Sequence, residues 1–300
     1  MVGGSGGLGV RAFHAVWLGI LLSVMWAWPS AMFVPIVLNR SGLAIHVLSA
    51  VVTLVLGFAV TWFAYKVVSR MPRRWLVVVT VCAVATAVCG VAAYLALVQF
   101  GVLGGLGGDR GDALDVALRR LLSGQYPYSE LTSWGGKITP LPGGLLLALP
   151  AHIVAHAGFS TVYLVPIAAL VMWKADRTAA AIACVALVLS PAFWADALSS
   201  GDLAVTTFLF FAVALGTVKN VNSAGAARWL WPLALGLVAA TRITTIINLL
   251  LVVALLIALR QGRRGLEIGA VALATAVAVS LPFYLLNPAE FSPLHTASFV

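Results

Sequence analysis

Charged residues are scarce in this chain. Only 9% of its 300 residues are Asp, Glu, Lys or Arg, whereas about a quarter are charged in ordinary globular domains. Hydrophobic residues make up 62%, and the mean hydropathy is +1.06. This scarcity excludes a soluble protein, so we expect a protein of the cell membrane.

Cysteine is also rare, and histidine occurs without the spacing of a metal site. Three cysteines, Cys82, Cys89 and Cys184, all lie in apolar runs, and we interpret them as buried structural thiols. His152 and His156 are four residues apart, but no Glu lies near them, so helix surface or packing explains them better than zinc. We predict no metal site and no cofactor, and a metal requirement stays open.

Clustered basic residues are missing, although the net charge is +9. The Lys and Arg residues are scattered in short loops, with no basic patch or aromatic-interleaved face. We therefore expect them to set membrane topology and to contact anionic lipid headgroups, with no nucleic-acid partner.

Apolar runs fill most of the sequence. A helix of roughly 20 residues crosses a hydrocarbon core of about 30 Å, and the runs are too continuous for alternating barrel strands. The sequence therefore predicts an all-α, polytopic transmembrane helical bundle, with residues 1–300 as one integral membrane domain. The runs cover residues 12–38, 43–65, 75–100, 141–157, 162–173, 179–195, 203–218, 229–240, 243–259 and 268–286.

The basic loops predict the sidedness. Lys66, Arg70, Arg73 and Arg74 share one short loop without an acid, which places that loop in the cytoplasm. The next span then brings residues 101–140 to the extracytoplasmic side. Two apolar runs follow before Lys174 where one crossing is required, so we expect one of them to be re-entrant or broken, at Pro150 or at Gly158.

The extracytoplasmic loop 101–140 contains an amphipathic helix with three carboxylates at its start. Asp112 suits an N-cap, and Asp115 suits the first turn or a pair with Arg119 four residues later. Asp109 then has no local role. A carboxylate just past a span, beside glycines that allow close approach, can take a proton from a hydroxyl, so Asp109 and Asp112 are both candidate bases.

Aromatic residues follow that helix. Tyr126 and Tyr128 lie in the sequence GQYPY, and Trp134 comes six residues later. Glycine and proline turn the chain here, so these rings suit the membrane interface. They equally suit stacking on a sugar, and the two interpretations are compatible.

Arg242 is an ionisable residue within an apolar sequence. Such residues are expensive in a bilayer and usually pair with a partner or face a wet cavity. The guanidinium fork matches phosphate oxygens, while a loop residue reaching the headgroups is the alternative. Asp196 and Asp202 bracket a short turn between two runs, where they either line the same cavity or solvate the turn.

Taken together, these stretches resemble the polytopic glycosyltransferases of the C superfamily, particularly the bacterial polyprenyl-phosphate-mannose-dependent mannosyltransferases. The resemblance covers residues 108–291 and rests on the order of its motifs. An Asp after an early span precedes a helix ending in GQYPY. After it come TPLPGG, SSGDLAV, and GLVAATRITT ahead of LPFYLLNPAEF.

The resemblance implies an inverting transfer of a sugar, mannose for these relatives, from a polyprenyl-phosphate donor to a glycolipid or glycan acceptor of the cell envelope. Asp109 or Asp112 would be the base, and Arg242 would meet the donor phosphate, where relatives often have lysine. We expect Tyr126, Tyr128, Trp134 and Asp202 to line the sugar or acceptor cavity. Further helices after Val300 are expected from the relatives, so the chain is either a fragment or a divergent member.

Two other functions fit the sequence. A transporter or lipid flippase also uses broken helices and intramembrane charges, although no internal repeat is visible. A non-catalytic membrane partner in envelope assembly is the third possibility. Substrate uptake without chemical turnover would favour the transporter, and copurification with a full-length enzyme would favour the partner.

Overall fold

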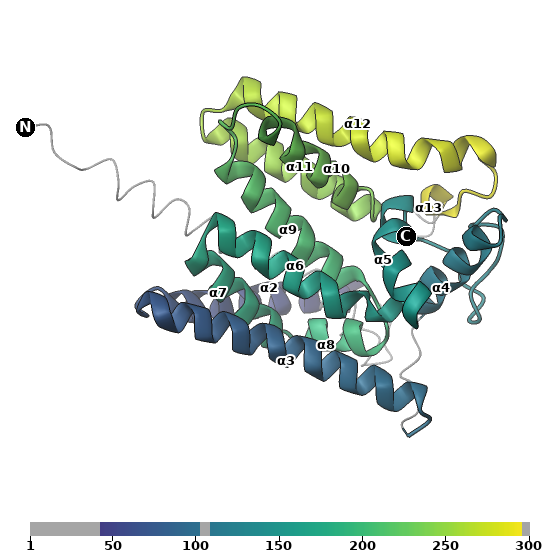
Figure 1. Ribbon diagram of the computed structural model, residues 1–300, viewed down its shortest axis with the longest axis horizontal. Coiled ribbons are helices and arrows are strands. Elements are labelled where there is room, and N and C mark those ends of the chain that lie inside the picture. Colours follow the sequence, from purple (N-terminus) through teal and green to yellow (C-terminus); the bar gives the residue numbers. More distant parts are fainter. Residues whose placement is uncertain (1–42, 103–108, 296–300) are drawn as a thin grey trace, which may run out of the picture. The chain divides into compact units, whose positions relative to one another are not determined.

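The computed structural model describes residues 43–102 and 109–295 (Figure 1). Every regular element in these two stretches is a helix, and β pairing there is limited to one isolated bridge between Leu131 and Lys137. The predicted all-helical fold is confirmed for this part of the chain. The predicted span 12–38, most of the glycine-rich lead 101–108 and Val300 lie outside the described residues.

The helices follow the predicted apolar runs closely, because long apolar segments satisfy their backbone groups best as helices. They are α2 (Leu43–Val68), α3 (Arg73–Gln99), α4 (Asp109–Leu122), α5 (Pro142–Val154), the short 3₁₀ helix η1 (Ala157–Phe159), α6 (Ser160–Ala175), α7 (Arg177–Val188), α8 (Pro191–Leu198), α9 (Leu203–Lys219), α10 (Ala227–Ala239), α11 (Ile243–Ala258), α12 (Gly262–Leu286) and α13 (Ser292–His295).

Two predicted runs are interrupted. The apolar run of residues 179–195 is divided between two helices, α7 and α8, with a bend of 65° between them. Pro191 explains the break, because proline lacks a backbone donor and disfavours helical geometry in the residue before it. The expected interruption between residues 141 and 173 lies at η1, which contains Gly158, whereas Pro150 stays inside α5.

Three helices of the described part are long and apolar enough to cross a membrane: Arg73–Gln99, Ala157–Ala175 and Gly262–Leu286. The bent pair of α7 and α8 would make a fourth if it counts as one span. Five shorter apolar helices accompany them. By length and composition, then, the chain has helices suited to a membrane.

The chain divides into two compact units, Met1–Thr86 with Asp176–Ala195, and Ala87–Ala175 with Asp196–Val300. In the first unit α2 packs against α7. The buried face of α7 is rich in alanine, including Ala180, Ala181 and Ala183. Small side chains on that face permit the close approach of a neighbouring helix.

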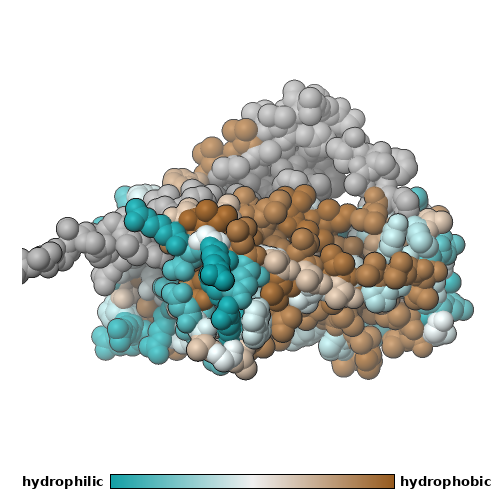
Figure 2. Space-filling model, turned by 90° about the horizontal axis from the view of Figure 1, so that it is seen from above, coloured by the Kyte–Doolittle hydropathy of each residue, from teal (hydrophilic) through white to brown (hydrophobic). Residues whose placement is uncertain are grey.

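In the second unit α9 packs against α6 on one side and α10 on the other, and α12 lies along α10 and α11 (Figure 1). The outer face of α12 is apolar over most of its length (Figure 2). Its exposed residues include Leu266, Leu273, Val277, Leu281 and Leu285. A row of leucines facing outward is typical of a surface that contacts lipid.

A separate part of the core in the second unit fixes α4. The apolar face of α4, with Leu114 and Leu118 fully buried, packs against Ile138, Leu145 of α5 and Phe291. Each fully buried Leu contributes roughly 1.5–3 kcal/mol relative to an exposed one. This packing holds the helix that carries the candidate carboxylates.

Candidate functional site

The carboxylates at the start of α4 are held by the loop that follows the helix. Asp109 accepts a hydrogen bond from the Thr132 hydroxyl. Asp112 accepts two through Oδ2, from the Ser133 amide at 2.5 Å and from the Ser133 hydroxyl at 2.8 Å. Two adjacent loop residues therefore bind two acids that lie three residues apart on α4, and the loop fixes the direction of both carboxylates.

The helix begins earlier than predicted. Because α4 starts at Asp109, Asp112 lies in its first turn and is not the residue before the helix, so the N-cap interpretation of Asp112 was wrong. Negative charge in a first turn is still favourable toward the helix dipole. Asp109, predicted without a local role, has the Thr132 hydroxyl as its partner.

The predicted aromatic residues separate into core and surface. Tyr128 is 4% exposed, donates its hydroxyl to the Pro140 carbonyl at 3.0 Å and packs edge-on against Phe291. Tyr126 is half-buried and donates to the carbonyls of Phe283 and Asn287. Trp134 is 68% exposed and follows Ser133 directly. Of these three rings, Trp134 is the one that lies near the carboxylates and is exposed enough to contact a bound molecule.

Burial raises the pKa of both tyrosine hydroxyls. Burial first, and the charge of Glu290 second, raise the pKa of Tyr126 to about 12. Burial likewise raises the pKa of Tyr128 well above its ordinary value, with Tyr126 adding to the effect. Both hydroxyls are therefore donors at neutral pH, as their carbonyl partners require.

Arg242 forms a buried ion pair with Asp202. The side chains of Arg242 and Asp202 are 11% and 4% exposed, and Nη2 of Arg242 donates to Oδ1 of Asp202. Arg242 Nη1 also lies 3.5 Å from the Thr139 hydroxyl. Within the described residues, Arg242 Nε and Asp202 Oδ2 are buried without a hydrogen-bond partner. Such groups are rare, because leaving one unpaired costs about 1–3 kcal/mol.

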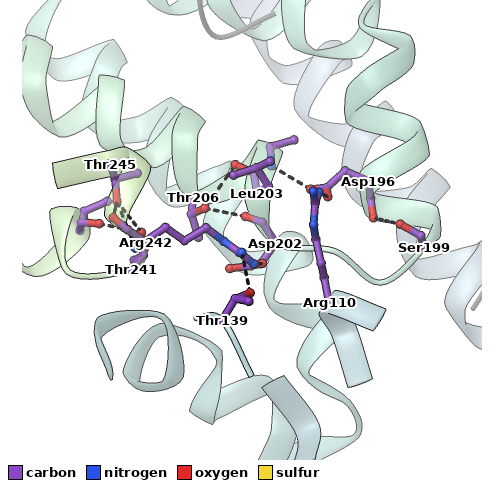
Figure 3. Close-up of polar contacts among 12 residues, drawn as sticks. Arg110, Thr139, Asp196, Ser199, Asp202, Leu203, Thr206, Thr241, Arg242 and Thr245 are labelled. Carbon is purple, nitrogen blue, oxygen red and sulfur yellow. Dashed lines mark hydrogen bonds and ion pairs between the residues drawn. The ribbon is translucent and has the colours of Figure 1, made fainter. Parts of the chain in front are cut away.

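A second ion pair lies beside the first (Figure 3). Arg110, next in sequence to Asp109, places Nη1 3.2 Å from Oδ1 of Asp196. Oδ2 of Asp196 accepts the Ala204 amide at 2.8 Å, at the start of α9. The two arginines thus converge on one short segment, residues 196–204, from α4 and from the start of α11.

Close backbone contacts position Arg242. The Gly143 amide donates to the Ala240 carbonyl at 3.0 Å, and the Leu141 amide donates to the Thr241 carbonyl at 2.9 Å. A side chain at Gly143 would place its Cβ 2.7 Å from the Ala240 carbonyl carbon. The sequence TPLPGG therefore holds the backbone immediately before Arg242, and glycine is required for this approach.

Asp115 has partners that the sequence analysis missed. It was predicted to pair with Arg119, but Oδ1 lies 2.5 Å from His152 Nδ1 and Oδ2 lies 2.6 Å from His156 Nε2. The Ala157 amide also donates to Oδ1 at 3.0 Å. The local spacing to Arg119 suggested one contact, whereas the two histidines come from a segment about forty residues later, which no local pattern indicates.

The sequence stretches singled out above meet in the second unit. The helix before GQYPY, the TPLPGG and SSGDLAV segments and the residues around Arg242 share the contacts just described, and Tyr126 bonds to LPFYLLNPAEF. Among the described residues no group of three His, Cys, Asp or Glu side chains is arranged to hold a metal ion.

Comparison with known proteins adds no assignment. The chain matches no protein family, no curated protein and no solved structure. A function must therefore be argued from the site itself.

Proposed function

We propose that this protein is a membrane glycosyltransferase that moves a sugar, as in the polyprenyl-phosphate-mannose enzymes that it resembles, from a polyprenyl-phosphate donor to an extracytoplasmic lipid or polysaccharide acceptor. The observation that carries the proposal is that two groups with complementary chemistry, the carboxylates of Asp109 and Asp112 and the guanidinium of Arg242, belong to one compact unit. Arg110, next to Asp109, pairs with Asp196, and Asp202 of the same short segment pairs with Arg242.

The carboxylates supply the base. Deprotonation of an acceptor hydroxyl requires an ionised acid within hydrogen-bond reach. Asp109 and Asp112 are held by Thr132 and Ser133 in a partly exposed position at a helix start. A fixed and accessible carboxylate is what this step needs.

Arg242 supplies the positive charge for the leaving phosphate. Its guanidinium is always charged and offers a planar set of donors, of which Nε is without a partner within the described residues. A phosphate oxygen would satisfy Nε and would exchange with Asp202 for the other donors. Asp202 then has a different role from the predicted cavity lining, because it neutralises Arg242 directly.

The reaction balances with these groups. The acceptor oxygen loses its proton to Asp109 or Asp112 and attacks C1 of the sugar, while the C1–O bond to phosphate breaks and the electron pair leaves with the phosphate. Attack from the face opposite the phosphate inverts the configuration at C1. Phosphate is a good leaving group, so no strong acid is needed on that side.

The test is transfer from a labelled polyprenyl-phosphate sugar, mannose first, by the full-length chain purified in detergent or reconstituted in vesicles. We expect the double variant Asp109→Asn with Asp112→Asn to lose about 10²–10⁴-fold in turnover, the range for general base catalysis. Glu130→Gln is the matched control, because Glu130 is an exposed acid of the same loop and pairs with Arg120 on the surface.

Two outcomes contradict the proposal. Full turnover in a folded double variant excludes the two acids as the base. Uptake of the lipid-linked sugar across the vesicle membrane without any chemical transfer indicates a transporter or flippase instead.

A further inference from the structure

Asp115 is the buried acid that the proposed transfer does not use. Its side chain is 11% exposed; Oδ1 accepts hydrogen bonds from His152 Nδ1 and from the Ala157 amide, and Oδ2 lies 2.6 Å from His156 Nε2. A buried carboxylate is stable only when it is well hydrogen-bonded. Asp115 therefore ties the middle of α4 to the corner between α5 and α6, one helical turn after Asp112.

The two histidines carry opposite tautomers. His156 Nδ1 accepts the Gly158 amide at 3.0 Å, so the proton lies on Nε2, which faces Asp115 at 2.6 Å. His152 presents Nδ1 to the same carboxylate at 2.5 Å, and because the carboxylate is an acceptor, Nδ1 carries the proton there. His152 thus keeps its basic lone pair on Nε2.

Proton uptake by His156 changes the hydrogen bonds that its imidazole makes. Protonation of His156 puts a proton on Nδ1, which breaks the hydrogen bond from Gly158 that caps η1. The hydrogen bond to Asp115 raises the pKa of His156, against the effect of burial, and the charges of Asp115 and Asp112 raise it further.

The ionisable groups around Asp115, His152 and His156 come from the elements packed next to them. From α4 come Asp112, whose charge acts on His156, and the exposed Arg119. The other residues of α5 and those of η1 are not ionisable, and α6 contributes Tyr163, which donates to the Leu147 carbonyl. The segment before α9 contributes the uncharged Ser200, which contacts Gly158.

We infer that Asp115, His152 and His156 are positioning residues for the proposed transfer: they fix the helix that carries Asp109 and Asp112, and proton uptake by His156 makes this hold depend on pH. The inference rests on the proposed function for its catalytic consequence. The geometry of the clamp itself, defined as these three residues, does not depend on that function.

The first measurement tests the clamp without any substrate. In the full-length chain labelled with ¹⁵N-histidine, the ring nitrogens of the five histidines are observed by NMR and assigned with His152→Gln and His156→Gln. We expect the Nδ1–H tautomer for His152 and the Nε2–H tautomer for His156, each altered by Asp115→Asn. The same tautomer in both residues, or no response to Asp115→Asn, would overturn the clamp.

The second measurement tests its effect on turnover. We expect His156→Gln to shift the pH profile of kcat by about one pH unit and to leave KM for the lipid-linked donor within about twofold, since the donor phosphate is bound elsewhere. Glu130→Gln is again the control and should keep the wild-type profile. A His156→Gln profile that superimposes on the wild type, in a folded protein, would refute the positioning role.

The NMR and turnover measurements distinguish failure of the proposed function from failure of the clamp. If the wild type transfers no lipid-linked sugar, the proposed function and the positioning role in it fail together, and the NMR arm still decides whether the clamp exists. If transfer occurs but the tautomers differ from those expected, the proposed function stands and this inference falls.

Discussion

Arg110 and Asp196 form an ion pair with 3.2 Å between Nη1 and Oδ1, and through it the residue next to Asp109 contacts the segment that carries Asp202. Asp196 is a buried acid with its other oxygen on the Ala204 amide. The pair therefore links the helix with the candidate base to the segment whose Asp202 neutralises Arg242.

Breaking the buried Arg242–Asp202 pair should destabilise the protein. Arg242→Met leaves the Asp202 carboxylate buried without its partner, which costs about 3–5 kcal/mol in comparable cases. Combining it with Asp202→Leu should restore most of that loss, because both charges are then removed. Thermal unfolding in detergent, followed by tryptophan fluorescence, measures the difference. Equal stability of the single and double variants would contradict the pairing.

A side chain at residue 136 should displace the candidate base without unfolding the loop. An added Cβ at Gly136 would overlap Oδ2 of Asp109, and this carboxylate can move aside at little energetic cost. A displacement of about 1 Å can lower turnover roughly 10²-fold, so we expect Gly136→Ala to lower kcat while changing stability by less than about 1 kcal/mol.

The control for that substitution is Gly262→Ala. An added Cβ there meets no atom within 4 Å, so turnover and stability should match the wild type. An active Gly136→Ala variant would indicate that Asp109 does not take the proton, and Asp112→Asn then becomes the variant that must be inactive.

Asp115→Asn should reduce the stability of the protein only at pH values at which the Asp115 carboxylate is ionised. Burial raises the pKa of Asp115, but the hydrogen bond and charge of His156 and the bonds from His152 and Ala157 together lower it below the ordinary 3.8. A lowered pKa in the folded protein means that the contribution is present above pH 3.8 and is lost as the pH falls through the folded value.

We therefore expect Asp115→Asn to cost about 1.5–3 kcal/mol near pH 6, the range for hydrogen bonds to a charged group. The difference from the wild type should shrink as the pH falls below 3.8. Urea unfolding at pH 6 and at lower pH values measures it. A constant difference across this range would show that the charge of Asp115 does not matter.

The loop 101–140 and the start of α12 should face opposite sides of the membrane. Arg260, Arg263 and Arg264 lie around the start of α12, and positive residues favour the cytoplasm. In a background without Cys82, Cys89 and Cys184, an impermeant maleimide should label Glu130→Cys in intact cells and should not label Gly262→Cys. Labelling of both positions, or the reverse pattern, would refute the proposed sidedness.

The positions of the helices could be predicted because the length of an apolar run depends only on neighbouring residues in the sequence. The runs that became α3, α9 and α11 could be read directly, and only Pro191 divided a run that looked continuous. Single residues of chemical interest, such as Asp109 and Arg242, could also be recognised, because a charge in an apolar context has few explanations.

Pairings between distant residues could not be read in the same way. Asp202 and Arg242 were both candidates, but forty residues separate them, and no periodicity reports such a contact. Arg119, four residues after Asp115, was a plausible ion-pair partner from its spacing. The contacts of Asp115 with His152 and His156 could not be predicted from any local spacing. Tyr128 looked interfacial from its GQYPY context, whereas its burial comes from Phe291, which is far along the chain.

Ser200 adopts a left-handed backbone conformation, with φ of 60°, and lies against both Gly111 of α4 and Gly158 of η1. This conformation is strained for a residue with a side chain. Ser200 lies two positions before Asp202, so the backbone that presents the partner of Arg242 is itself wedged between α4 and η1.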